Sequence, residues 1–296
     1  MRKYLPVLSL ILLVLTCKSP PQSQNIPEPP SKNPAAVLEF ERIEASGIDQ
    51  VALHYRLKTG NPRSNPLETE IKNWKGVING IEFTSDSSAL SMDGAGALGK
   101  QLHAEPASSA EKTLILHLDL KDLKAASDSL ENDEYLTQLT LELDYRYAHN
   151  ESQKHEVSAD AVFPRIREPR FTITSIAIMQ AELINTRFKV SLRIDNPNVF
   201  PVALSSFGYE LFGDGSFWAD GIEKDVLHIP AHSSSQTDLH LIMNFINMKR
   251  QLLDDIIAMK QVRYRFSGTV DVGTGIAWLP SFNMDFDRSG NSPVVR

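Results

Sequence analysis

Hydrophobic and polar side chains alternate with a period of two along most of the chain from Val37 onward. Between Phe188 and Asp195, every second residue is apolar and its neighbours are polar; residues 139–147, 239–245 and 262–266 repeat the pattern. Such alternation places one face of a strand on a core and the other in water, as in antiparallel sheets. Because Gly, Asn, Asp and Ser separate these segments at short intervals, we expect a mostly β fold of antiparallel β-sandwiches.

Several features recur at a constant offset of 135 positions, which indicates one module written twice. Prolines within these features lack a backbone N–H, so we expect them beyond the ends of strands. The Asn-Gly and Asp-Gly pairs supply the positive φ values that two-residue hairpins need, so we expect a tight turn at each. The paired features are Asn61-Pro62 with Asn196-Pro197, Pro66 with Pro201, Trp74 with Tyr209, and Asn79-Gly80 with Asp214-Gly215.

Further along, Pro106 pairs with Pro230, and the offset there falls to 124. The first copy therefore carries about ten extra residues, which we place at 91–100 in "SMDGAGALGK". The glycines of this insertion do not have the spacing of the dinucleotide-binding fingerprint.

Each copy also holds one segment with helical periodicity. In the second copy the segment follows a candidate cap at Asn247, and the first copy has a weaker counterpart. The apolar positions in the second copy are Leu252, Leu253, Ile256 and Met259. In the first copy, the corresponding positions, with a weaker apolar face, are Leu123, Ala126, Ser127 and Leu130. We therefore expect two tandem antiparallel β-sandwiches, each with one short α-helix.

These patterns divide the folded part of the chain into two domains. We place the first sandwich at residues 37–166 and the second at residues 169–287. The join, "FPRIREPR", is short, so the two domains should sit close together with little freedom between them. Residues 288–296 carry Ser, Gly, Asn and Pro, and we expect them to form a flexible tail.

The first 17 residues have the pattern of an export signal. A basic start is followed by an apolar run from Leu5 to Leu15, which is too short to span a bilayer. The run ends in "VLTC", which resembles a bacterial lipoprotein signal cut before a cysteine whose sulfur takes a lipid. We therefore expect lipidation at Cys17 and a lipid anchor in a membrane of the bacterial cell envelope. An ordinary secretory signal with an incidental cysteine is the alternative.

Residues 18–36 are rich in proline and nearly free of large apolar side chains. Such a segment cannot bury enough surface to fold. In polyproline geometry, at about 3.1 Å per residue, it would reach roughly 50 Å. We expect it to be an extended tether that holds the folded domains off the membrane.

Composition and charge exclude several classes of function. The net charge is −7 with no dense basic tract, which argues against nucleic acid as a partner. With a single cysteine, the chain has neither an internal disulfide nor a thiolate-built metal site.

The second copy resembles a known family. Its residues "NPNVFPVALSSFGYELFGDG", then "ADG", then "IPAHSSS", fall in the order found in the water-stress and hypersensitive-response (WHy) domain. That domain belongs to the group 2 late embryogenesis abundant (LEA), or desiccation-related, proteins. The first copy keeps the Asn-Pro, the second proline and the Asn-Gly turn, but lacks the "NPN" triplet. The resemblance implies a small sandwich like fibronectin type III domains, a role in desiccation or stress, and no enzymatic activity.

Residues able to carry chemistry form no convincing set. Pro230 separates His228 from His232 and prevents a helix that would align them, so we expect a surface loop and no metal site. Asp254 and Asp255 point apart on a helix, and Asp285 and Asp287 share a strand face near the end of the fold, so solvated charge explains both pairs. We expect no catalytic residues and no cofactor. A hydrolase using Asp285 or His232 stays as the enzymatic alternative.

Aromatic side chains surround the Asp214-Gly215 turn. Most should lie in the sandwich core, but Phe217 and Trp218 are also candidates for an exposed lip that binds a partner. Trp278 in "GIAWLP" has the same two interpretations. The sequence thus favours a non-enzymatic envelope lipoprotein acting in stress protection or as a binding scaffold for protein clients. The alternative is an envelope carrier for a lipid or other apolar ligand.

Overall fold

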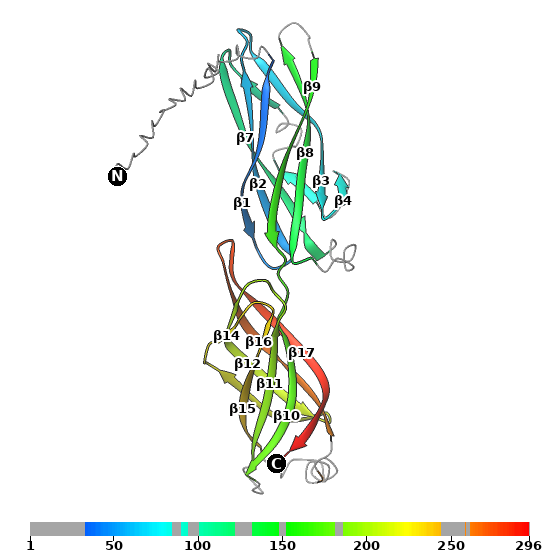
Figure 1. The fold of residues 1–296 in the computed structure, drawn as a ribbon, viewed down its shortest axis with the longest axis vertical. Helices are drawn as coiled ribbons and strands as arrows, with labels where there is room; N and C mark the ends of the chain where they lie inside the picture. Colours follow the sequence, from blue (N-terminus) through cyan, green and yellow to red (C-terminus); the bar gives the residue numbers. More distant parts are fainter. Residues whose placement is uncertain are drawn as a thin grey trace, which may run out of the picture.

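The computed structural model describes residues 33–84, 90–93, 101–121, 132–147, 152–180, 186–243, 258 and 261–295. Within these residues the fold is mostly β, with antiparallel pairing in nearly every strand pair, as the alternating pattern predicts. The strands form an N-terminal lobe, β1 to β9, and a C-terminal lobe, β10 to β17. Figure 1 shows the two lobes arranged end to end, with β9 leading into β10 at the waist between them.

The N-terminal lobe contains two sheets. In the first, the strand order is β1-β2-β7-β5, and in the second it is β4-β3-β8-β9, with β6 also paired to β3. The strands are β1 (Ala35–Ala45), β2 (Gln50–Asn61), β3 (Leu67–Ile78), β4 (Ile81–Thr84), β5 (Leu90–Asp93), β6 (Gln101–Ala104), β7 (Ser108–Asp119), β8 (Glu134–Tyr147) and β9 (Ser152–Pro164).

The C-terminal lobe repeats this order within one continuous set of pairings, β13-β12-β16-β17-β10-β11-β15, with β14 paired to β12. A short parallel pairing of Ile176 with Val294 joins the two halves of the set. The strands are β10 (Arg170–Gln180), β11 (Thr186–Asn196), β12 (Val202–Gly213), β13 (Ser216–Glu223), β14 (Leu227–Ile229), β15 (Ser233–Met243), β16 (Gln261–Ile276) and β17 (Leu279–Val295).

Each lobe has its own hydrophobic core, to which both groups of strands contribute. In the N-terminal lobe, Leu53 of β2 and Leu141 of β8 are fully buried in one cluster. In the C-terminal lobe, Leu192 of β11 and Phe266 of β16 are buried in another. Because strand side chains alternate between faces, the apolar half of each pattern meets in the space between the sheets.

The predicted hairpins are confirmed at both positions. Asn79 and Gly80 have φ values of 49° and 84°, and Asp214 and Gly215 have values of 45° and 77°. Positive φ at both central residues gives the turn whose twist suits a two-residue hairpin. The paired prolines lie beyond strand ends, because β2 and β11 end at Asn61 and Asn196 and the next strands begin only at Leu67 and Val202.

The predicted correspondence between Pro106 of the first copy and Pro230 of the second is wrong by one residue. In β7 and β15, Ser108 lies opposite Asn61 and Ser233 lies opposite Asn196, which gives an offset of 125 positions. Pro230 therefore corresponds to Glu105 and not to Pro106. The shared requirement is for backbone geometry and not for proline, because Ala107 and His232, which follow, both have positive φ.

The ends of the predicted domains also need correction. Residues 288–295 are not a flexible tail, because they form the last part of β17 and pair with β16 up to Gln261 opposite Pro293. Val294 is buried in the core, and Tyr264 lies so close to Gly290 that a Cβ there would be 2.7 Å from its hydroxyl oxygen. At the other end, β1 starts at Ala35, inside the predicted tether.

Several predictions concern residues outside the described ranges. They include the signal segment, Cys17, the tether up to residue 32, and the helical candidates Leu123–Leu130 and Leu252–Met259. The described ranges contain strands and, at Leu120 and Lys121, two residues in helical conformation. No helix long and apolar enough to cross a membrane occurs among the residues that were placed.

Candidate functional site

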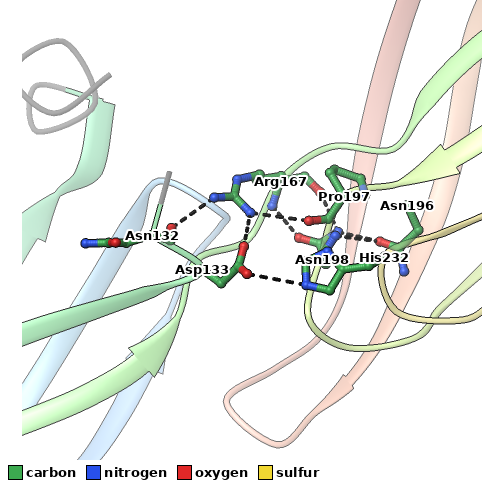
Figure 2. A network of polar contacts seen from close by, with 7 residues as sticks. All are labelled: Asn132, Asp133, Arg167, Asn196, Pro197, Asn198 and His232. Carbon is green, nitrogen blue, oxygen red and sulfur yellow. Dashed lines mark hydrogen bonds and ion pairs between the residues drawn. The ribbon is translucent and has the colours of Figure 1, made fainter. Parts of the chain in front are cut away.

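The lobes are held together by polar contacts around the segment that joins β9 to β10 (Figure 2). The guanidinium of Arg167 donates to a carboxylate oxygen of Asp133 over 2.6 Å and to the carbonyl of Asn132 over 2.9 Å, both in the N-terminal lobe. On the other side, Nε2 of His232 lies 3.3 Å from the second oxygen of Asp133. One carboxylate therefore bridges the linker and the C-terminal lobe.

Asn198 binds the backbone of the linker to the C-terminal lobe. Its Oδ1 accepts the backbone N–H of Arg167 over 2.7 Å, and its Nδ2 donates to the carbonyl of the same residue over 2.8 Å. Asn198 is buried. A buried amide that satisfies both backbone groups of one residue fixes the path of the chain there.

Asn196 holds the loop that carries Asn198. Its Nδ2 donates to the carbonyls of Phe200, Ile229 and Pro230 at 2.9, 3.3 and 2.9 Å. Its Oδ1 accepts the backbone N–H of Asn198 over 3.0 Å. The "NPN" triplet belongs to a sequence motif, but the sequence does not reveal this role, because the carbonyls of Ile229 and Pro230 lie more than 30 positions away.

Electrostatics favour a charged Asp133 at this junction. The hydrogen bond from Arg167 is the main cause that holds the pKa of the Asp133 carboxyl below its usual range, and burial opposes it only in part. Arg165 lies over the ring of Tyr135 at 5.9 Å, so a second linker arginine also contacts the N-terminal lobe. The linker is therefore tied to both lobes.

Trp278 adds an apolar contact across the junction. It lies in the hairpin between β16 and β17, and its ring meets that of Phe163 in the N-terminal lobe at 6.1 Å and 90°. It is half-buried against the N-terminal core. The sequence predicted Trp278 either in the core of its own lobe or on an exposed lip. Instead, its indole packs against the core of the N-terminal lobe.

The junction also contains a shallow cavity of about 370 Å³. Arg165, Arg167, Arg170 and Arg288 line it together with Asp49 and Glu168. The two carboxylates offset part of the positive charge, and Arg167 is already engaged by Asp133.

Phe217 and Trp218, the predicted partner-binding pair, are separated by the pleat of β13. Phe217 is 57% exposed and meets Phe212 edge-on at 5.6 Å. Trp218 is buried, stacks on Phe188 and covers Gly213, where a Cβ would overlap the indole. Successive side chains of a strand point to opposite faces, so only Phe217 is placed to meet a partner.

A cavity of about 300 Å³ opens between the sheets of the C-terminal lobe, on the side of β14 and β15. Its inner wall is apolar, and its mouth carries charged side chains. The lining residues are Ile194, Leu204, Phe207, Leu227 and Leu239 inside, and Glu223, Asp225, Val226, Thr237, Asp238 and His240 toward the mouth.

The candidates for chemistry are far apart or already engaged. Arg265 forms a two-pronged ion pair with Asp287 at 2.6 and 2.9 Å, which also lowers the pKa of the Asp287 carboxyl. Asp285 lies opposite Thr269 in the ladder of β16 and β17. In the described part of the chain no three His, Cys, Asp or Glu side chains form a group that could hold a metal ion. Asp254 and Asp255 lie outside it.

Comparison with solved structures finds distant likenesses. A crystal structure from Archaeoglobus fulgidus is 15% identical, with 42% of this chain and 94% of that chain covered and a TM-score of 0.26. A solution structure of an Arabidopsis thaliana protein is 12% identical, with 45% and 86% covered and a TM-score of 0.34. No curated protein matches the sequence.

The comparison with protein families gives one match. Residues 191–285, from β11 into β17, match the family described as Late embryogenesis abundant protein. The matched range includes Asn196, Asn198, the Asp214-Gly215 turn and the inter-sheet cavity. The C-terminal lobe therefore contains a domain of the LEA group 2 type.

Proposed function

We propose that the chain is a non-enzymatic lipoprotein, anchored to a membrane of the bacterial cell envelope through Cys17, that acts as a binding scaffold in stress protection. The family match of residues 191–285 supports a desiccation-related domain in the C-terminal lobe. The lipoprotein-like segment that ends at Cys17 and the proline-rich segment after it support the anchor and the tether.

The observation that carries this proposal is the place where the chain enters the folded part. Ala35, the first residue of β1, pairs with Gly60 at the end of the N-terminal lobe away from the junction. The turn after β1 lies at the other end, where Ile48 and Asp49 reach the junction cavity beside Arg165. A tether joined at Ala35 would therefore present the C-terminal lobe farthest from the membrane (Figure 1).

We also propose that the N-terminal lobe is a divergent second WHy domain. Asn61 donates to the carbonyls of Asn65, Ala104 and Glu105, as Asn196 does to its three carbonyls. The paired turns and the order of the strands support the same duplication. A shared fold with different surfaces would let one lobe act as a spacer and the other as the binding lobe.

The test of the scaffold role is protection of a labile client enzyme during drying. All described strands and both cores lie beyond residue 32, so a chain that begins at Lys18 keeps the whole described fold. We expect client activity after rehydration to exceed that obtained with an inert protein of equal mass at equal concentration. Equal recovery with the two proteins would contradict the protective role.

A second candidate function is that of a carrier for an apolar ligand, and the inter-sheet cavity of the C-terminal lobe supports it. Ligand sites in proteins are usually concave, largely apolar and about 300–1,000 Å³ in volume. This cavity, with about 300 Å³, has space for a short apolar chain. Native mass spectrometry of protein purified from its host tests the idea, which fails if no small molecule copurifies and no apolar dye is displaced.

A further inference from the structure

We infer that the inter-sheet cavity of the C-terminal lobe binds small amphiphiles that have a short apolar chain and a protonated amine head. The inference rests on the carrier function proposed above and adds the chemical class of the ligand. It depends on three observations, each made on the described residues: an apolar inner wall, a mouth whose Glu223 and Asp225 form no ion pair, and an edge strand, β15, that lacks the outer partner which β5 provides to β7 in the N-terminal lobe.

The most deeply buried residues of the lining are apolar. Ile194 on β11, Leu204 and Phe207 on β12, and Leu239 on β15 are each at most 6% exposed. Burying apolar surface gains about 25 cal/mol per Å², so an alkyl chain is the group that this wall favours. A polar head inserted here would lose its hydrogen bonds to water and would gain none.

The mouth selects the head group by charge. The Oε1 atom of Glu223 accepts the backbone N–H groups of Lys224 and Asp225 at 3.1 and 3.2 Å, which fixes the carboxylate at the rim. Among the described residues, neither Glu223 nor Asp225 forms an ion pair. A primary ammonium group has three donors and a compact charge, so it fits a rim of two carboxylates.

The other charged groups of the mouth do not change its preference for a positively charged head group. Asp238 accepts a hydrogen bond from the hydroxyl of Ser191 over 2.7 Å and lies 3.6 Å from Nζ of Lys189. The Ser191 hydrogen bond is the main cause that lowers the pKa of the Asp238 carboxyl, so this group stays ionised while Lys189 compensates it. His240 is an exposed neighbour on the same strand. Glu223 and Asp225 therefore set the preference for a cation.

The N-terminal lobe provides a built-in contrast. At the positions that correspond to Ile194 and Leu204 it has Thr59 and Thr69, so its equivalent wall carries buried hydroxyls. Its strand β5 also pairs along the outer edge of β7 from Ile115 to Leu118. In the described residues β15, the counterpart of β7, is the last strand of its sheet. In the part of the C-terminal lobe that the structure describes, an apolar wall thus occurs together with an edge strand that has no outer partner.

The experiment compares three probes that share one chain: octylammonium, octanol and octanoate. Each is titrated into the chain that begins at Lys18, and binding is followed by calorimetry and by amide shifts in NMR spectra. Octylammonium should bind about two- to thirtyfold more tightly than octanol, since two exposed charge contacts at about 0.2–1 kcal/mol each act together. Octanoate should bind more weakly than octanol, and 0.5 M salt should narrow the difference.

Two variants locate the site. The double change Glu223→Gln and Asp225→Asn should bring octylammonium to the affinity of octanol and leave octanol unchanged. The matched control, Glu39→Gln with Glu68→Gln, removes two exposed carboxylates of the N-terminal lobe and should change nothing. Leu204→Thr, which copies Thr69 of the N-terminal lobe, should weaken all three probes, and its unchanged circular dichroism would show that the lobe is folded.

Each outcome bears on a different claim. Equal binding of octylammonium and octanol would overturn the cationic preference and leave the carrier function standing. Binding that survives Leu204→Thr in a folded protein would overturn the location. If none of the three probes binds, both the inference and the carrier function fail, while the scaffold role is tested separately by the drying experiment.

Discussion

Asn61 and Asn196 lie 135 positions apart and make the same hydrogen bonds in the two lobes. Each Nδ2 donates to three backbone carbonyls, those of Asn65, Ala104 and Glu105 in one lobe and of Phe200, Ile229 and Pro230 in the other. Each Oδ1 accepts the N–H two residues further along, on Arg63 or Asn198. One buried side chain in each lobe therefore ties a proline-containing crossing to a distant strand end.

The first prediction is that Asn196→Ala destabilises the C-terminal lobe by about 2–4 kcal/mol. The change removes the donor of three carbonyls, and buried polar groups without a partner cost about 1–3 kcal/mol each before water partly replaces the contact. Asn196→Asp should be no better, because a carboxylate cannot donate to a carbonyl. Urea denaturation followed by the NMR amide signals of β11 and β12 measures the loss.

Asn61→Ala is the matched control and should lower the stability of the N-terminal lobe instead, as reported by the NMR amide signals of β2 and β3. If either variant unfolds with the wild-type midpoint, the asparagine is not the cross-link described. If Asn61→Ala affects only the transition of the C-terminal lobe, the assignment of each asparagine to its own lobe is wrong.

A second prediction concerns Gly213, which lies beneath the indole of Trp218. A Cβ on Gly213 would overlap the ring, so Gly213→Ala should displace Trp218 and cost about 1–3 kcal/mol as overpacking. Gly208→Ala on the same strand is the control, because its Cβ would meet Thr269 at an ordinary 3.6 Å. Near-ultraviolet circular dichroism and urea midpoints separate the two. Equal midpoints for the two variants would contradict the contact.

A third prediction is that Asp133→Asn loosens the junction without unfolding either lobe. The amide keeps the shape of the carboxylate but loses the charged partner of Arg167 and the contact with His232. The distribution of distances between two spin labels, one on each lobe, should broaden in the variant. The free energies of unfolding of the two lobes, measured in urea, should stay within about 0.5 kcal/mol of wild type. A distribution as narrow as that of wild type would show that Asp133 does not hold the junction.

The same carboxylate makes the junction sensitive to acid. Because Arg167 lowers the pKa of Asp133 in the folded chain, the stabilising contribution is fully present above the ordinary aspartate pKa of about 3.9. It is lost as the pH falls through the lowered folded value. The wild-type distance distribution should therefore stay narrow from pH 7 to about pH 5 and broaden only in stronger acid. Asp133→Asn should lack this step, and a wild-type distribution that stays narrow even in strong acid would show that the Asp133 carboxylate does not control the junction.

A fourth prediction tests coupling between the lobes through Trp278. Although it belongs to the C-terminal lobe, Trp278→Ala should lower the stability of the N-terminal lobe by about 1–2 kcal/mol, less than the roughly 3–5 kcal/mol of a fully buried Trp. Trp278→Phe should recover part of the loss because a ring can still meet Phe163. Hydrogen exchange at the amides of β9 reports the effect, and unchanged exchange there would rule the contact out as a source of stability.

Much of the fold could be predicted from local patterns. Alternation identifies strands because the core needs every second side chain, and Asn79-Gly80 or Asp214-Gly215 identify turns because few residues adopt positive φ twice in succession. Proline positions follow from the missing N–H. These features depend on neighbours in the sequence, so one sequence suffices to find them.

The remaining features depend on distant partners. Residues 288–295 read as a tail because Ser, Gly and Pro seldom favour strands, yet the exposed backbone of β16 fixes them by pairing. Trp218 is buried because Gly213 leaves a space for its ring across the hairpin. The bonds of Asp133, Arg167 and Asn198 join three separate segments, and no local pattern reveals which polar residues will meet.

The central claim, that the chain is tethered by lipid at Cys17, is tested most directly by the mass of the N-terminal peptide of protein purified from its host membranes. We expect a peptide that begins at Cys17 and carries the mass of attached acyl groups. We also expect Cys17→Ser to release the protein from the detergent phase in phase partitioning. A peptide that retains residues before Cys17, or that carries Cys17 as a free thiol, would contradict the account.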